Sequence, residues 1–127
     1  MTKAGFEGML QAMARAWAAR DYAGAAGWFA EDVRYADPLR YRHASRRELL
    51  RFFEDDEGRE QRTVWHNAVF DGDRQVGAAE YTYEGTNRYH GLVLIKLRDD
   101  KVTHWREYQH VSDLDWEDFW AGAAFSG

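Results

Sequence analysis

The first part of the chain spaces its apolar residues as a helix does. Between residues 5 and 19 they recur three or four positions apart, at Phe6, Met9, Leu10, Met13 and Trp17. This spacing places them on one side of a helix and predicts an amphipathic helix. Asp21 and Ser45 are expected to begin two further helices, because aspartate and serine accept hydrogen bonds from the free amides of a first helical turn.

Between the second and third helices, Val33 to Tyr35 predicts a short strand. It is expected to end at Asp37-Pro38, because proline has no amide hydrogen with which to continue a sheet ladder. After Gly58 the pattern changes from helical spacing to alternation, which is typical of strands. Four long strands are predicted in succession, over Gln61–Phe70, Gln75–Tyr83, Arg88–Leu97 and Val102–Val111. From Asp113 onward a short helix or an aromatic clasp is expected.

Helices at the front and strands behind them indicate an α+β fold, with helices packed on one face of a curved antiparallel sheet. A length of 127 residues suits a single domain over residues 1–127. The net charge is −5 and the basic residues form no stripe, so we expect no nucleic acid partner. No apolar run reaches 18 residues, so neither membrane insertion nor secretion is expected.

The chain contains no cysteine, which excludes disulfides and thiolate chemistry and fits a cytoplasmic location. Its five histidines show neither His-x-His nor HExxH spacing, so no metal site is expected. A glycine-rich phosphate loop and a dinucleotide fingerprint are also missing from the sequence, and we therefore expect no cofactor.

Two short motifs carry the candidate chemistry. They are Tyr35-Ala36-Asp37-Pro38 and Trp105-Arg106-Glu107-Tyr108, and each sets a carboxylate beside aromatic residues. Burial among aromatic groups disfavours the charged form of a carboxylate, which helps it to exchange protons near neutral pH. We therefore expect Asp37, Glu107 and Tyr35 to be the catalytic residues, with Tyr89 as a further hydrogen-bond donor.

The element order and the two motifs, Tyr-x-Asp-Pro before the third helix and a closing Lys-x-x-x-Trp-Arg-Glu-Tyr, resemble the nuclear transport factor 2-like superfamily. Within it the chain looks most like the SnoaL-like branch, whose relatives are polyketide cyclases, ketosteroid isomerase and limonene epoxide hydrolase. The resemblance covers about residues 11–116. It implies a cone-shaped half-barrel, in which three helices pack on the curved sheet around one pocket. A homodimer packed through the outer sheet face is also expected, because Leu92, Leu94 and Tyr108 would otherwise leave an exposed apolar patch there.

The resemblance carries over only part of either active site. Asp37 falls where ketosteroid isomerase has its general base, but the isomerase's two oxyanion donors align with Met13 and Val93, which disfavours steroid isomerisation. Tyr35 and Asp37 fall on the water-positioning residues of limonene epoxide hydrolase, and Glu107 on a carboxylate of its site. The hydrolase's Arg-x-Asp has no clean match here, and Glu80 is the nearest carboxylate.

On the last strand, by the same resemblance, the face that carries Trp105, Glu107 and Gln109 lines the pocket. The predicted substrate-binding residues are Trp28, Trp65, Tyr81, Tyr89, Val93, Trp105 and Gln109. A bulge would turn Glu80 inward in place of Tyr81. Asp37 could instead be a turn residue bound to its own backbone, and Glu107 could form a salt bridge with Arg88 or Arg106.

Two functions stay open at this point. The first is an acid-base enzyme of the isomerase, cyclase, dehydratase or hydrolase type, acting on a small apolar or aromatic molecule. The second is a non-catalytic ligand-binding or dimeric interaction module of the same fold. A catalytic pocket should bury Asp37 or Glu107 without an arginine partner, whereas a binding pocket should show both carboxylates neutralised.

Overall fold

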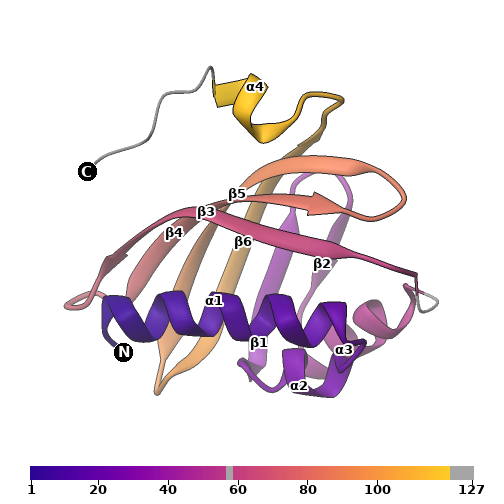
Figure 1. Ribbon diagram of the computed structural model, residues 1–127. Helices are drawn as coiled ribbons and strands as arrows, with labels where there is room; N and C mark the ends of the chain where they lie inside the picture. The colour runs from indigo at the N-terminus through magenta and orange to yellow at the C-terminus, as the bar shows by residue number, and fades with distance from the viewer. Residues whose placement is uncertain (57–58, 121–127) are drawn as a thin grey trace.

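The computed structural model describes residues 1–56 and 59–120 (Figure 1). The elements in chain order are α1 (Lys3–Ala18), α2 (Tyr22–Ala26), β1 (Phe29–Asp37), β2 (Tyr41–His43), α3 (Arg46–Glu54), β3 (Arg62–Asp71), β4 (Val76–Glu84), β5 (Arg88–Arg98), β6 (Lys101–Val111) and α4 (Trp116–Trp120). The predicted α+β fold is confirmed. None of the helices among these residues is long and apolar enough to cross a membrane.

The six strands form one curved, open sheet in the order β2-β1-β6-β5-β4-β3. Helices α1, α2 and α3 lie on its concave side, and α4 lies on the opposite side (Figure 1). Strand β1 runs parallel to β6, while every other neighbouring pair is antiparallel. The sheet is therefore mixed, and not antiparallel throughout as expected; its first and last long strands lie side by side, one strand in from the β2 edge.

Side-chain caps begin the helices where the sequence indicates. The Asp21 carboxylate accepts a hydrogen bond from the amide of Gly24 at 3.0 Å. The Ser45 hydroxyl accepts one from the amide of Glu48 at 3.1 Å, and the Glu48 carboxylate in turn accepts one from the amide of Ala44 at 2.6 Å. These bonds satisfy amides that have no partner inside their helix, and both predicted caps are confirmed.

Strand β1 begins at Phe29, four residues earlier than the alternation at Val33 indicates. Its pairing with β6 shifts register between Phe29 and Arg34, and this irregularity hides the alternation in the sequence. Strand β2 was not predicted, because three residues are too few to show a period of two. It folds back on the end of β1, with Tyr41 opposite Asp37.

The predicted alternation of β6 is confirmed. Trp105 and Glu107 are buried on the concave face, while Arg106 and Tyr108 are exposed on the convex face. The bulge that left Tyr81 uncertain lies in β3, between Trp65 and Asn67, rather than in β4. Strand β4 therefore keeps Tyr81 on the concave face.

On the convex face, α4 covers a small polar cluster. The ring of Trp116 stacks on His66 with centroids 3.7 Å apart, and the carbonyl of Leu114 lies 2.8 Å from Nε2 of His90. The hydroxyl of Thr82 bridges the two histidines, at 2.6 Å from His66 and 2.9 Å from His90. The segment expected to be a short helix or an aromatic clasp is both.

Candidate functional site

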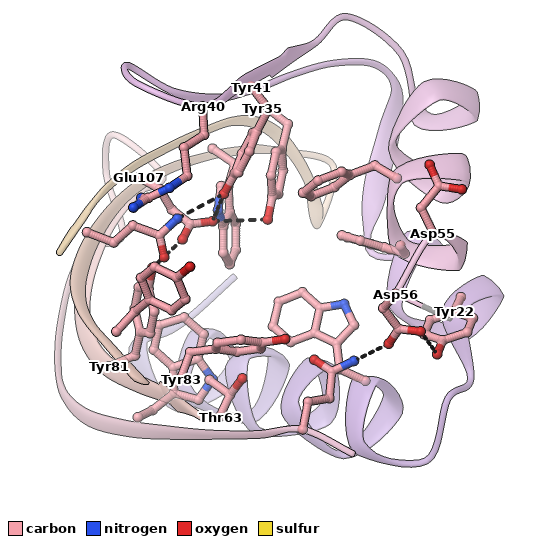
Figure 2. A pocket seen from close by; sticks show the side chains of 18 residues that line it. Tyr22, Tyr35, Arg40, Tyr41, Asp55, Asp56, Thr63, Tyr81, Tyr83 and Glu107 are labelled. Atoms are coloured by element: carbon pink, nitrogen blue, oxygen red, sulfur yellow. Dashed lines mark hydrogen bonds between the residues drawn. The ribbon is translucent and has the colours of Figure 1, made fainter. Parts of the chain in front are cut away.

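A cavity of about 390 Å³ opens between the concave face of the sheet and the helices (Figure 2). This volume lies in the range of small-molecule pockets. Its wall is mostly aromatic, formed by Trp17, Tyr22, Tyr35, Tyr41, Phe52, Phe53, Trp65, Tyr81, Tyr83, Tyr89 and Trp105. Its polar lining consists of Arg40, Asp55, Asp56, Gln61, Thr63, Glu107 and Gln109.

Glu107 is the buried carboxylate of this cavity, with 6% of its surface exposed. Its Oε1 accepts hydrogen bonds from the indole of Trp105 at 2.6 Å and from the hydroxyls of Tyr35 at 3.0 Å and Tyr41 at 3.2 Å. Its Oε2 is hydrogen-bonded to the hydroxyl of Tyr81. All four partners are uncharged.

The ion pairs of the described residues do not include Glu107. Arg88, one of the two possible partners in the alternative interpretation, instead pairs with Glu84 at 3.5 Å and Asp115 at 2.9 Å. The other, Arg106, points from the opposite face of β6. The alternation that brings Glu107 into the cavity therefore keeps its neighbouring arginine out of it.

The tyrosines around Glu107 are held in their protonated form. Burial, followed by the nearby charge of Glu107, raises the pKa of Tyr35, Tyr41 and Tyr81. Each hydroxyl therefore keeps its hydrogen and remains able to donate a hydrogen bond.

Asp37 lies behind the cavity wall, so the expectation that it lines the pocket is wrong. Its Oδ1 accepts hydrogen bonds from the amides of Leu39 at 2.8 Å and Arg40 at 3.1 Å, as in an ordinary turn. Its Oδ2 lies 3.7 Å from the guanidinium of Arg40 and accepts a hydrogen bond from Nε2 of Gln109 at 3.0 Å. Gln109 thus stands between Asp37 and the cavity.

Two further expected pocket residues lie elsewhere. Val93 is fully buried in the core on β5, opposite Glu107 in register but beneath the wall. Trp28 directly precedes β1, and its carbonyl accepts a hydrogen bond from the amide of Val102 at 2.9 Å. Both belong to the packing of the fold, Val93 as a core residue and Trp28 as a partly buried residue packed against the core. The expected residues that do line the cavity are Tyr35, Trp65, Tyr81, Tyr89, Trp105, Glu107 and Gln109.

Sequence reasoning missed the contribution of the β1–β2 hairpin. Tyr41 donates to Glu107, and the guanidinium of Arg40 lies 5.0 Å from the centre of the Tyr89 ring. The signal was weak, since a three-residue strand after Asp37-Pro38 reads as part of a loop. The ends of α1 and α3 also bring Trp17 and Phe53 into the cavity wall, a role that their apolar helical spacing does not reveal.

The side of the cavity opposite Glu107 has a polar rim (Figure 2). There the carboxylate of Asp56 accepts hydrogen bonds from the hydroxyl of Tyr22 at 2.5 Å and from Nε2 of Gln61 at 2.6 Å. Asp55 lies on the same side. In the part of the chain that the structure describes, no group of three or more histidine, aspartate or glutamate side chains could hold a metal ion.

Comparison with known proteins gives the family, since the SnoaL-like domain matches residues 10–105. The chain belongs to the SnoaL-like family. Among curated proteins, none matches this SnoaL-like chain in sequence.

Solved structures share the fold. A candidate ketosteroid isomerase from Kribbella flavida has a TM-score of 0.70 and 20% identity, over 85% of this chain and 79% of that one. An epoxide hydrolase of the limonene type from M. tuberculosis has a TM-score of 0.69 and 18% identity, over 90% and 85%. A candidate polyketide cyclase from Xanthomonas campestris has a TM-score of 0.69 and 17% identity, over 94% and 97%. These neighbours confirm the cone-shaped fold of this SnoaL-like protein.

Proposed function

We propose that this SnoaL-like protein is an acid-base enzyme that converts a small apolar or aromatic molecule in the cavity. The observation that carries the proposal is Glu107, a buried carboxylate in an aromatic cavity with no ion-pair partner among the described residues. A structural carboxylate is usually exposed or paired with a cation, whereas a proton-transfer group is held in a dry site. Isomerase, cyclase, dehydratase and hydrolase reactions all use such a group.

The roles within the site differ from those first expected. Glu107 is the proton-transfer group, and Tyr35, Tyr41 and Trp105 stabilise the charge that it gains or loses. Asp37 supports the site from behind, because Arg40 and two backbone amides already bind its carboxylate. Trp65 and Tyr89 serve as apolar walls for the substrate.

The alternative is a ligand-binding or interaction module without catalysis. The ion pair between Arg40 and Asp37 favours this alternative. In a binding pocket both candidate carboxylates are expected to be neutralised by a cation, and Asp37 meets that criterion. Glu107 favours catalysis, and it is the carboxylate that lines the cavity.

The two functions separate in one experiment. Small cyclic ketones, epoxides and hydroxylated aromatic compounds are screened for binding by thermal shift and then for conversion by mass spectrometry. The enzyme hypothesis expects Glu107→Gln to lose conversion and keep binding, since glutamine retains the shape and cannot exchange the proton. Glu80→Gln is the matched control, because Glu80 bonds to Asn67 at 3.1 Å and is not part of the cavity wall. Compounds that bind tightly and are never converted would support the binding module.

The proposal includes a homodimer that forms through the convex face of the sheet. Four apolar or aromatic side chains on that face are exposed, namely Val69, Leu92, Leu94 and Tyr108. A patch of this kind favours burial against a second copy. A cytoplasmic location is also proposed, on the ground that a chain without cysteine suits a reducing compartment.

A further inference from the structure

The charged side chains that line the cavity are mainly negative. Three of them are carboxylates, from Asp55, Asp56 and Glu107. The remaining one is the guanidinium of Arg40, so the described lining residues carry a net charge of −2. Glu107 lies on one side of the cavity, and Asp55 and Asp56 lie on the other (Figure 2). A ligand between them meets negative potential from both sides, which attracts cations and repels anions.

The positive charge of Arg40 does not neutralise Glu107. The guanidinium lies 3.7 Å from Oδ2 of Asp37, its ion-pair partner, and 5.0 Å from the centre of the Tyr89 ring. Glu107 is bound instead by the uncharged donors described above, and hydrogen bonds of this kind favour the carboxylate form. Its negative charge therefore stands in a buried site with no cation paired to it among the described residues, and there it attracts a charged ligand more strongly than it would in water.

One oxygen of Glu107 can still accept a hydrogen bond. Oε1 already accepts three, from Trp105, Tyr35 and Tyr41. Among the described residues, Oε2 has one partner, the hydroxyl of Tyr81. A carboxylate oxygen has two lone pairs, so Oε2 can accept a second hydrogen bond. A protonated amine supplies both a donor for this oxygen and the positive charge that Glu107 lacks.

The aromatic wall near Glu107 also suits a cation. The rings of Trp17 and Trp65 stand at 88° and 79° to the ring of Trp105, with centres 6.3 and 6.2 Å from it. Tyr81 meets Trp65 at 63°. A flat ligand stacks best between parallel rings, whereas rings at steep angles enclose a rounder group. Aromatic rings that enclose a substituted ammonium group bind it through the negative potential of their faces.

We propose that the cavity is selective for organic cations, and that its substrate is an apolar or aromatic molecule that carries a protonated amine. Glu107 supplies the countercharge and accepts a hydrogen bond from the amine at Oε2. The indole and phenol rings enclose the carbon groups around the nitrogen. This inference rests on the proposed function, because it names the substrate class for the same cavity.

Three compounds with one apolar body test the preference for charge. They are 1-aminoadamantane, 1-adamantanol and 1-adamantanecarboxylate, which at pH 7 carry a positive charge, no charge and a negative charge. Isothermal titration calorimetry measures the affinity of each for the wild-type protein. The amine should bind about tenfold more tightly than the alcohol, as expected for one buried charged hydrogen bond and the attraction of the rings. The carboxylate should bind most weakly.

Variants identify the group that selects the amine. Glu107→Gln should bring the amine to within about twofold of the alcohol, and the affinity for the alcohol should stay the same. Glu80→Gln is the matched control and should leave the ranking unchanged, because Glu80 is not part of the cavity wall. In Arg40→Gln the amine should bind at least as tightly as in the wild-type protein, since this change removes the one positive charge among the described lining residues.

A wild-type protein that binds the alcohol as tightly as the amine, or that does not bind the amine at millimolar concentration, would overturn the inference. This ranking needs no variant, so it stands as a test even if Glu107→Gln fails to fold. A carboxylate that binds most tightly and loses its affinity in Arg40→Gln would assign the cavity to anions instead. A protein that prefers the amine and converts no compound would refute the proposed function alone. Conversion of uncharged compounds without a preference for the amine would refute this inference alone.

Discussion

Gly91 is the position at which one added carbon should disrupt the site. It lies on β5 between Tyr81 and Gln109 in register. A Cβ atom there would stand 2.5 Å from Cζ and 2.6 Å from the hydroxyl oxygen of Tyr81. The Tyr81 ring has little room to retreat, because Trp65 packs edge-on against it at 5.3 Å and its hydroxyl is bonded to Glu107. Gly91→Ala should therefore push Tyr81 away from Glu107.

Two opposing effects set the magnitude. Replacing a strand glycine with alanine should stabilise the folded state by about 0.5–1 kcal/mol, because the unfolded chain loses freedom. Overpacking costs about 1–3 kcal/mol, and a displaced hydroxyl that leaves buried polar groups unpaired costs about 1–3 kcal/mol more. The penalty exceeds the gain, and Gly91→Ala should lower the free energy of unfolding by about 1–5 kcal/mol. Urea denaturation followed by tryptophan fluorescence measures it.

A double-mutant cycle isolates the clash. In a Tyr81→Ala background the ring is gone, and Gly91→Ala should cost almost nothing. Gly8→Ala is the matched control, because no atom lies within 4 Å of its added carbon and Gly8 sits in a helix, so it should stabilise by about 0.5–1 kcal/mol. An equal penalty for Gly91→Ala in both backgrounds would refute the steric reasoning.

Three further predictions follow from the fold. Phe53→Ala should lower the free energy of unfolding by about 3–5 kcal/mol, because its ring packs against Trp17 and Phe29; an unchanged urea midpoint would contradict this packing. Burial lowers the pKa of His66 to about 4, so on acidification the unfolded chain takes up a proton at this residue before the folded protein does. The free energy of unfolding should therefore fall as the pH drops from about 6.5 to about 4, by no more than about 1.4 kcal/mol per pH unit. This pH dependence should be smaller in His66→Gln. Sedimentation equilibrium at micromolar concentration should show a dimer that Leu92→Glu dissociates, and a 14.9 kDa species alone would rule the dimer out.

The sequence predicted the fold where its signals were periodic and local. The apolar stripe from Phe6 to Trp17 and the alternation along β6 each repeat over enough positions to be read. Strand β2 has three residues and no such repeat, so Tyr41 was missed as a donor to Glu107.

The sequence predicted which residues form the candidate site better than it predicted the hydrogen bonds that join them. Alternation placed Glu107, Trp105 and Gln109 on one face, as the structure has them. The position of Asp37 depends on a turn whose amides capture its carboxylate, and a turn residue and a pocket residue look alike in sequence. The bonds that join Asp37, Gln109 and Tyr81 come from three different strands, and no local pattern encodes them.

The parallel pairing of β1 with β6 also determines when the cavity can exist. Tyr35 and Glu107 are 72 positions apart, yet they share one hydrogen bond across these two strands. Closing so long a segment carries an entropic cost that only the finished sheet repays. Trp105, Glu107 and Gln109 lie on β6, the last of the described strands to be synthesised. The cavity therefore cannot form while only the helices and the first hairpins have left the ribosome. Until β6 inserts, β1 and β5 both present open edges to other chains.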